Sequence, residues 1–248
     1  STAEMYYAAV LSGDKNLQAV FKTGGDFHTE VSISVFGLIV PDEDVLKGMV
    51  VLGELEKATR KCYVETFYPG RRQAAKSTSF GILYGAGPET VAEQAGISLT
   101  EAKEAIKDYF LRFPRLKRWL DDNSEAIKQK GFLYSFFGRK RRLLNAKSSD
   151  KALQSHDVRS GINFLVQSIA SDANLTGAME AYDELEAKKL DFHMFALVHD
   201  SIVSEVKDED VDEYITIVKR NLQADIGISI EGCPIGVDFG VGESYAEA

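Results

Sequence analysis

The chain has 248 residues, of which 44% are hydrophobic and 27% charged, so it is long enough to fold around a sizeable core. It contains no apolar stretch of about eighteen residues, and its first residues lack the basic start and cleavage site of a signal peptide. These features exclude a membrane-spanning chain and predict a cytoplasmic protein. The only two cysteines, Cys62 and Cys233, have no metal-ligand spacing, so we expect neither a disulfide framework nor a zinc site.

Charge is unevenly distributed along the chain. The formal net charge of -9 argues against a protein that coats nucleic acid with its whole surface. Basic residues are nevertheless clustered at 71–76, at 112–118 and at 139–142. One such cluster would be read as a solvated face, whereas three in one half of the chain favour a polyanionic ligand.

Helices are expected over most of the first two thirds of the chain. The expected helices cover 4–12, a segment after 29, an apolar-periodic run at 43–63, 71–84, a short helix from Pro88, a helix capped by Thr100, and a helix from Pro114 to Gly131. Later segments predict a hairpin at 132–144, a long helix at 150–188, two strands with a tight turn at 199–200, a helix at 209–226 and a strand near 234–239. The pattern predicts an α+β fold in which a helical subdomain is inserted into a sheet-bearing one.

The helix expected at 71–84 carries an unusual stripe. Arg72, Lys76, Phe80 and Tyr84 lie at i, i+4, i+8 and i+12, so they share one slowly drifting face. The cations can hold phosphates and the rings can pack on a sugar and a base, which indicates a nucleoside triphosphate. Spacing alone leaves an alternative, in which the rings belong to the core and the cations to a solvated helix end.

The residue types in this stripe resemble a known motif. The pattern Arg72-x3-Lys76-x3-Phe80-Gly81-x2-Tyr84 is similar to motif B, the nucleotide-binding fingers helix of family A (DNA polymerase I-like) DNA polymerases. The resemblance implies that Arg72 and Lys76 bind the triphosphate. It also implies that Phe80 stacks on the incoming sugar and base, and that Tyr84 stacks near the templating base. Family members with Phe at the position of Phe80 tend to reject dideoxynucleotides, whereas those with Tyr accept them.

Two earlier segments resemble other parts of the same family. Ser1-Thr2-Ala3-Glu4 is similar to the second half of motif A, which implies that Glu4 crowds the sugar 2′ position and excludes ribonucleotides. By residue type alone, Glu4 is equally an acid favoured by a helix N-terminus. The sequence Asp-Phe-His-Thr at 26–29 resembles an Asp-Ile-His-Thr segment of the family, which implies that His28 donates a hydrogen bond to the triphosphate.

Two later segments imply contacts with primer-template DNA. Arg139, Lys140 and Arg141 follow a Gly, as in a family Gly-Arg-Arg-Arg segment beside the template strand, where they would neutralise phosphates. Further along, the family has Arg, Asn and Gln at a spacing matched here by Arg159, Asn163 and Gln167. Amides can bond the minor-groove acceptors that every base pair presents. The alternative for this second stripe is a polar seam between packed helices.

The segment Val198-His199-Asp200 resembles motif C of the family. The resemblance implies that Asp200 binds two catalytic Mg²⁺ ions and that His199 approaches the primer end, although an isolated Asp at a tight turn usually caps its own backbone. Two Mg²⁺ ions about 3.5 to 4 Å apart require shared anionic ligands. In the family the second Asp precedes the Ser that matches Ser1 by two residues, so we expect that ligand from outside this sequence.

The resemblance covers essentially the whole chain and predicts its organisation. We expect the end of motif A in the palm at 1–30, fingers at 31–130, and palm with motif C and a C-terminal strand at 131–248. The expected function is template-directed synthesis of DNA from deoxynucleoside triphosphates, as the C-terminal part or a subunit of a polymerase. An upstream polypeptide is expected to carry the second Asp, the thumb and any exonuclease, and this chain alone is expected to be inactive.

Two other functions are alternatives to this one. A non-catalytic nucleic-acid-binding or assembly module would have no need for the triphosphate-binding stripe of Arg72, Lys76 and Phe80. A template-dependent RNA polymerase or reverse transcriptase of related palm architecture is disfavoured by Glu4, because an enzyme that uses ribonucleotides would not carry a gate against them.

Overall fold

The chain folds into helices joined to two separate β-hairpins in the computed structural model, which describes residues 2–198 and 201–244. The elements in chain order are α1 (Thr2–Ser12), α2 (Lys15–Lys22), α3 (Phe27–Phe36), α4 (Glu43–Val51), α5 (Arg60–Phe67), α6 (Arg71–Leu83), α7 (Pro88–Ala95), α8 (Leu99–Arg112), α9 (Pro114–Lys130), β1 (Phe132–Tyr134), β2 (Lys140–Arg142), α10 (Lys151–Lys188), β3 (Phe192–Val198), β4 (Ser201–Val206), η1 (Asp208–Asp210) and α11 (Val211–Leu222). Of the predicted α+β fold, the coarse form is confirmed: the chain is mostly helical with small antiparallel sheets.

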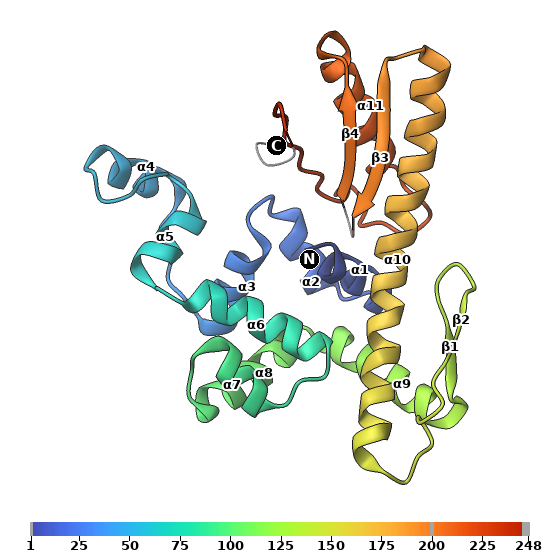
Figure 1. Cartoon of the computed structure of the whole chain (residues 1–248). Coiled ribbons are helices and arrows are strands. Elements are labelled where there is room, and N and C mark those ends of the chain that lie inside the picture. The colour runs from blue at the N-terminus through green and yellow to red at the C-terminus, as the bar shows by residue number, and fades with distance from the viewer. Residues whose placement is uncertain (1, 199–200, 245–248) are drawn as a thin grey trace.

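The long helix α10 is the element against which the others are arranged (Figure 1). Helices α1 and α9 pack against it, and α11 packs against its C-terminal part. Helices α3, α6, α7 and α8 form a group on one side of α10, from which α4 and α5 project outward, while the β1–β2 hairpin lies on the other side (Figure 1). The arrangement leaves one face of α10 between α6 and the hairpin.

Local cap chemistry explains most helix boundaries. The Asp26 side chain accepts a hydrogen bond from the Thr29 backbone N–H at 2.9 Å and so begins α3. Ser98 and Glu101 form a capping box that begins α8, two residues before the Thr100 cap that the sequence predicts. Gly131 ends α9 in the left-handed conformation, with φ of 76°, as predicted.

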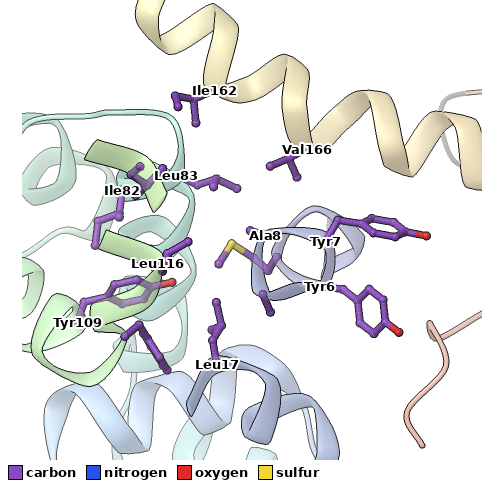
Figure 2. Packing of buried hydrophobic residues seen from close by; sticks show 14 of the residues in the cluster. Tyr6, Tyr7, Ala8, Leu17, Ile82, Leu83, Tyr109, Leu116, Ile162 and Val166 are labelled. Atoms are coloured by element: carbon purple, nitrogen blue, oxygen red, sulfur yellow. The ribbon is translucent and has the colours of Figure 1, made fainter. Parts of the chain in front are cut away.

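The main core forms where α1, α2, α6, α8, α9 and α10 converge (Figure 2). Helix α1 is buried around most of its circumference, because five consecutive residues are at most 3% exposed: Met5, Tyr6, Tyr7, Ala8 and Ala9. Such a helix is fixed from all sides. Because Glu4 lies on α1, its position is set by this core.

Tyr6 joins α1 to the C-terminal segment of the chain. Its hydroxyl donates a hydrogen bond to the Cys233 carbonyl at 2.7 Å and accepts one from the Ile230 backbone N–H at 2.9 Å. Both partners lie in a turn closed by a bridge between Ile230 and Cys233. The side chain thus satisfies two backbone groups that burial would otherwise leave unpaired.

The C-terminal hairpin has its own small core. In β3 and β4, Leu197 pairs with Ile202 and Val198 with Ser201, and the register shifts between Met194 and Ala196. One face of the hairpin covers a second cluster formed by Ala181, Leu185, Tyr214 and Ile217, which come from α10 and α11. The predicted strands at this position are confirmed, and the turn between them lies outside the described residues.

The structure differs from the sequence-based expectations in four places. Helix α2 forms where none was expected, because Asp14 caps it with bonds to the backbone of Asn16 and Leu17. The run at 43–63 is two helices, α4 and α5, separated by a turn that contains Gly53 at φ of 74°. The strand expected near 234–239 is absent, although these residues are described by the structure. The helix expected at 209–226 is shorter: it begins with the η1 turn and ends at Leu222.

No helix in the described part of the chain has the length and apolarity that a membrane span needs.

Candidate functional site

Helix α6 presents the predicted stripe on one face. Gly70 begins the helix in the left-handed conformation at φ of 79°, and Tyr84 ends it. The opposite face is buried and is formed by Ala74, Ala75, Thr78, Ser79, Ile82 and Leu83. The rings of Phe80 and Tyr84 stack with their centroids 6.0 Å apart and their planes at 20°. The two aromatic residues of the stripe are therefore in contact, and Lys76 is exposed one turn before them.

Helix α3 brings His28 and Asp26 to the same face of α6. The His28 ring lies 5.7 Å from the Phe80 ring, centroid to centroid. The Arg72 guanidinium donates two parallel hydrogen bonds to the Asp26 carboxylate, from Nε at 2.7 Å and from Nη2 at 2.8 Å. This fork geometry gives a strong, oriented pair. Asp26, His28, Arg72, Lys76 and Phe80 together are called the α3–α6 cluster below.

The Arg72–Asp26 pair also fixes the charge state of the cluster. Burial acts to raise the pKa of Asp26, but the hydrogen bonds from Arg72 and Thr29 and the Arg72 charge outweigh it and hold that pKa well below its ordinary value. Asp26 is therefore ionised at neutral pH. The same pair raises the pKa of Arg72, whose Nη1 also lies 3.6 Å from Glu65.

His28 is buried at 6% exposure, and its Nδ1 has no hydrogen-bond partner among the described residues. Burial lowers the pKa of His28 to about 4; the Asp26 carboxylate opposes this shift, and the Arg72 and Lys76 charges add to it. His28 is therefore neutral at neutral pH. An unpaired polar atom beside two cations is a position where a polar ligand can complete the hydrogen bonding.

Glu4 links three helices at the edge of the cluster. Its carboxylate accepts a hydrogen bond from the Tyr84 hydroxyl at the end of α6. The other carboxylate oxygen lies 3.3 Å from Nε2 of Gln167 on α10, which donates to it. Burial, followed by the hydrogen bond to Glu4, raises the pKa of Tyr84 above its ordinary value. The structure thus brings the predicted residues Glu4, Tyr84 and Gln167 together.

A cleft of about 400 Å³ lies beside Tyr84 along α10. We call it the α10 cleft; it is lined by Tyr84, Arg141, His156, Arg159, Ser160, Asn163, Phe164 and Gln167. None of these side chains is acidic, in a chain whose net charge is -9. The Oδ1 atom of Asn163 is buried and has no hydrogen-bond partner among the described residues. The residues of the predicted α10 stripe therefore line an open cavity with basic and polar walls, while Gln167 also contacts Glu4 across the packing of α10 against α1.

The three basic residues predicted to bind phosphates on the β1–β2 hairpin point in different directions. Arg141 lines the α10 cleft, where its Nη2 donates to Ser160 Oγ at 3.1 Å. Arg139 instead forms an ion pair with Asp172 on α10 at 2.8 Å. Lys140 lies over the Phe132 ring, 4.0 Å from its centroid. Arg141 is thus the residue of the three that reaches the cleft.

The predicted catalytic residues His199 and Asp200 lie outside the described residues. Within the ranges 2–198 and 201–244, no group of three or more His, Cys, Asp or Glu side chains could hold a metal ion. The metal-ligand role of Asp200 stays a prediction.

Three lining residues of the cleft were not predicted as site residues: His156, Ser160 and Phe164. A signal for them is present in the sequence, because positions 156, 159–160, 163–164 and 167 repeat at the spacing of one helix face. Polar or aromatic side chains at that spacing are equally typical of a solvent-exposed helix face and of a binding site. The cavity beside them depends on the fold and could not be predicted from the sequence.

The fold and the site together define the class of protein. The structure matches a solved structure described as the POL domain of Pol1 from M. smegmatis in complex with DNA primer-template and dNTP, with a TM-score of 0.75 and 25% sequence identity. The match covers 93% of this chain and 37% of that chain. The fold is therefore that of a DNA polymerase I polymerase domain, of which this chain forms part.

The chain belongs to DNA polymerase family A, whose family model matches residues 54–247. It is 43% identical to the DNA polymerase of Escherichia phage T5, over 96% of this chain and 28% of that protein. It is 29% identical to the thermostable DNA polymerase I of Thermus aquaticus, over 100% of this chain and 26% of that protein. The chain thus spans about a quarter of the length of these relatives.

Proposed function

We propose that this chain supplies the nucleotide-binding part of a DNA polymerase that extends a primer 3′-OH by template-directed transfer of deoxynucleotides. One observation carries the proposal: the α3–α6 cluster, with two cations, an unpaired buried His28 atom and a ring, adjoins the acid-free α10 cleft through the Tyr84–Glu4 contact. A triphosphate site next to a cleft for a duplex is what nucleotide addition requires.

Within the cluster, Arg72 and Lys76 bind the triphosphate and His28 donates a hydrogen bond to it. The two hydrogen bonds to Asp26 orient the Arg72 guanidinium, so this group is already ordered before the nucleotide binds. Phe80 packs on the incoming sugar and base; its ring contacts both His28 of the cluster and Tyr84 at the end of α6. Glu4 occupies the position under the sugar and restricts the space for a 2′-hydroxyl.

The α10 cleft receives the primer-template duplex. Asn163 and Gln167 offer amide donors to minor-groove acceptors, while Arg159 and Arg141 bind backbone phosphates. Tyr84 lies in both sites, because its ring stacks on Phe80 and also lines the cleft. It is therefore placed to contact the templating base next to the incoming nucleotide.

Family A polymerases use Mg²⁺, which in two-metal catalysis activates the primer hydroxyl and stabilises the leaving pyrophosphate. We propose that Asp200 supplies one ligand, with His199 near the primer end, and that a second carboxylate comes from outside these 248 residues.

We further propose that residues 1–30 and 131–248 belong to the palm and that residues 31–130 form the fingers. Between 31 and 130 every described regular element is a helix, whereas both hairpins fall after residue 131. The thumb, and any exonuclease, would be supplied by another part of the polymerase.

Primer extension tests the proposal. The complete polymerase that contains this chain is given a primed template, Mg²⁺ and all four deoxynucleotides, with Asp200→Ala as the control variant. Extension that Asp200→Ala abolishes is the expected result. Binding of DNA without any extension would instead favour a non-catalytic nucleic-acid-binding module. Extension by this chain alone would overturn the proposal that a carboxylate from outside it is needed.

A further inference from the structure

The polar face of α10 continues one turn beyond the stripe that the family pattern covers. His156, Arg159, Asn163 and Gln167 follow one another at intervals of three, four and four residues and all line the α10 cleft. Gln167 marks one end of this face, where it contacts Glu4. His156 marks the other end, about 16 Å away at 1.5 Å per residue.

His156 lies beside an anchored carboxylate at this end. Its Nδ1 lies 3.6 Å from Asp157 Oδ1, and its side chain is 73% exposed while that of Asp157 is 10% exposed. The other oxygen of Asp157 accepts a hydrogen bond from the Asn145 backbone N–H at 2.6 Å. The Asp157 carboxylate is thus fixed to the loop before α10, and the imidazole beside it is free to meet a ligand in the cleft.

Arg141 contributes a second basic group to the same cleft from the β1–β2 hairpin. Ser160 Oγ accepts a hydrogen bond from its guanidinium at 3.1 Å, and its Cζ lies 5.6 Å from the centroid of the Phe164 ring. Both partners are cleft residues of α10, so the guanidinium is oriented before any ligand binds. Arg141 and His156 therefore offer donors to one ligand from two different elements.

We propose that His156 is a further DNA-contacting residue, which binds a backbone phosphate together with Arg141 at the end of the α10 cleft remote from Glu4. The inference rests on the proposed function and extends it. The acid-free lining suits an anion, and DNA supplies phosphates at about 3.4 Å per nucleotide along each strand. A face about 16 Å long then spans up to about five base pairs, which places the contact about five base pairs from the nucleotide site.

The first test measures how salt affects binding of a fluorescent primer-template to the complete polymerase. His156→Ala is compared with His193→Ala, a matched control, because His193 is an exposed histidine on β3 outside the cleft. His156→Ala is expected to weaken binding about threefold to tenfold and to reduce the slope of log affinity against log salt by up to about one. His193→Ala is expected to leave both unchanged.

The second test locates the phosphate. Single phosphates of the primer and template strands are replaced in turn by neutral methylphosphonates. One replacement about four to six base pairs from the primer end is expected to weaken binding by the wild type and to have no further effect in His156→Ala, because the two changes remove the same contact. His156→Lys, which keeps a donor, is expected to retain the sensitivity.

The outcomes separate this inference from the proposed function. Wild-type binding to primer-template combined with an unchanged affinity and salt slope in His156→Ala would overturn this inference alone. So would a methylphosphonate profile that is the same in the wild type and in His156→Ala. Absence of primer-template binding by the wild-type polymerase would overturn the inference together with the DNA-binding part of the proposed function.

Discussion

The Tyr84 hydroxyl donates a hydrogen bond to the Glu4 carboxylate and so joins the end of α6 to the start of α1. The contact connects the residue proposed to select the sugar with the residue proposed to contact the templating base. Because Gln167 also donates to Glu4, the three proposed tasks of sugar selection, template contact and duplex contact meet at one carboxylate.

Glu4→Ala is expected to raise incorporation of ribonucleotides relative to deoxynucleotides by about tenfold or more, because the space under the sugar opens. Single-nucleotide incorporation kinetics with matched ribo- and deoxynucleotides measure the ratio. Tyr84→Phe is the control, since it removes the hydrogen bond to Glu4 and keeps the ring. If the Glu4→Ala enzyme selected deoxynucleotides over ribonucleotides as well as the wild type does, Glu4 would only support Tyr84 and would not exclude the 2′-hydroxyl.

Phe80→Tyr is expected to raise incorporation of dideoxynucleotides by about tenfold or more, because the added hydroxyl lies beside the incoming sugar and can replace a hydrogen-bonding group that the dideoxy sugar lacks. The measurement is the ratio of chain termination to extension at fixed nucleotide concentrations. The ring itself keeps its contacts with His28 and Tyr84. An unchanged ratio would argue that Phe80 does not face the sugar.

Asp26→Ala is expected to lower the free energy of unfolding by about 2 kcal/mol, because it removes the cap of α3 and leaves Arg72 without its half-buried partner. Urea unfolding measures the change. Asp42→Ala is a matched control: Asp42 is an exposed cap of α4, and its loss is expected to cost about 1 kcal/mol or less. Equal losses in the two variants would mean that the Arg72–Asp26 pair adds nothing to stability.

His28 is expected to make stability depend on pH in a defined window. Its folded-state pKa is lowered from 6.5 to about 4, so the unfolded chain binds the proton more tightly. The stabilisation is therefore fully present above about pH 6.5 and is lost as pH falls through about 4. The loss attributable to His28 is of the order of 2 to 3 kcal/mol.

Unfolding free energies at several pH values between 7 and 4 measure this effect. His28→Asn is expected to flatten the dependence in that window. The lowered pKa of Asp26 acts at more acidic pH, because its stabilisation is lost only below the ordinary range of a carboxyl group. A wild-type profile that matches that of His28→Asn between pH 7 and 4 would mean that His28 titrates normally.

Sequence patterns predicted features that depend on local chemistry. Gly131 and Pro114 set helix ends as expected, and the 71–84 stripe lies on one face of α6 because helix geometry leaves no other arrangement. Contacts between residues that are far apart in the sequence could not be predicted from these local patterns. Arg139 appears in the sequence as a cation for DNA, yet its partner Asp172 lies 33 residues away on α10. Likewise, nothing local indicates that Tyr6 contacts Cys233.

The most direct test of the proposed nucleotide site is the dependence of single-nucleotide incorporation on dNTP concentration in Lys76→Ala, with Lys107→Ala as the control. Both lysines are exposed on helices of the same helical group, but Lys107 lies on α8 outside the α3–α6 cluster. The apparent dissociation constant of the dNTP is expected to rise about tenfold or more in Lys76→Ala and to stay at the wild-type value in Lys107→Ala. A wild-type dissociation constant in Lys76→Ala would contradict the assignment of the α6 face as the triphosphate site.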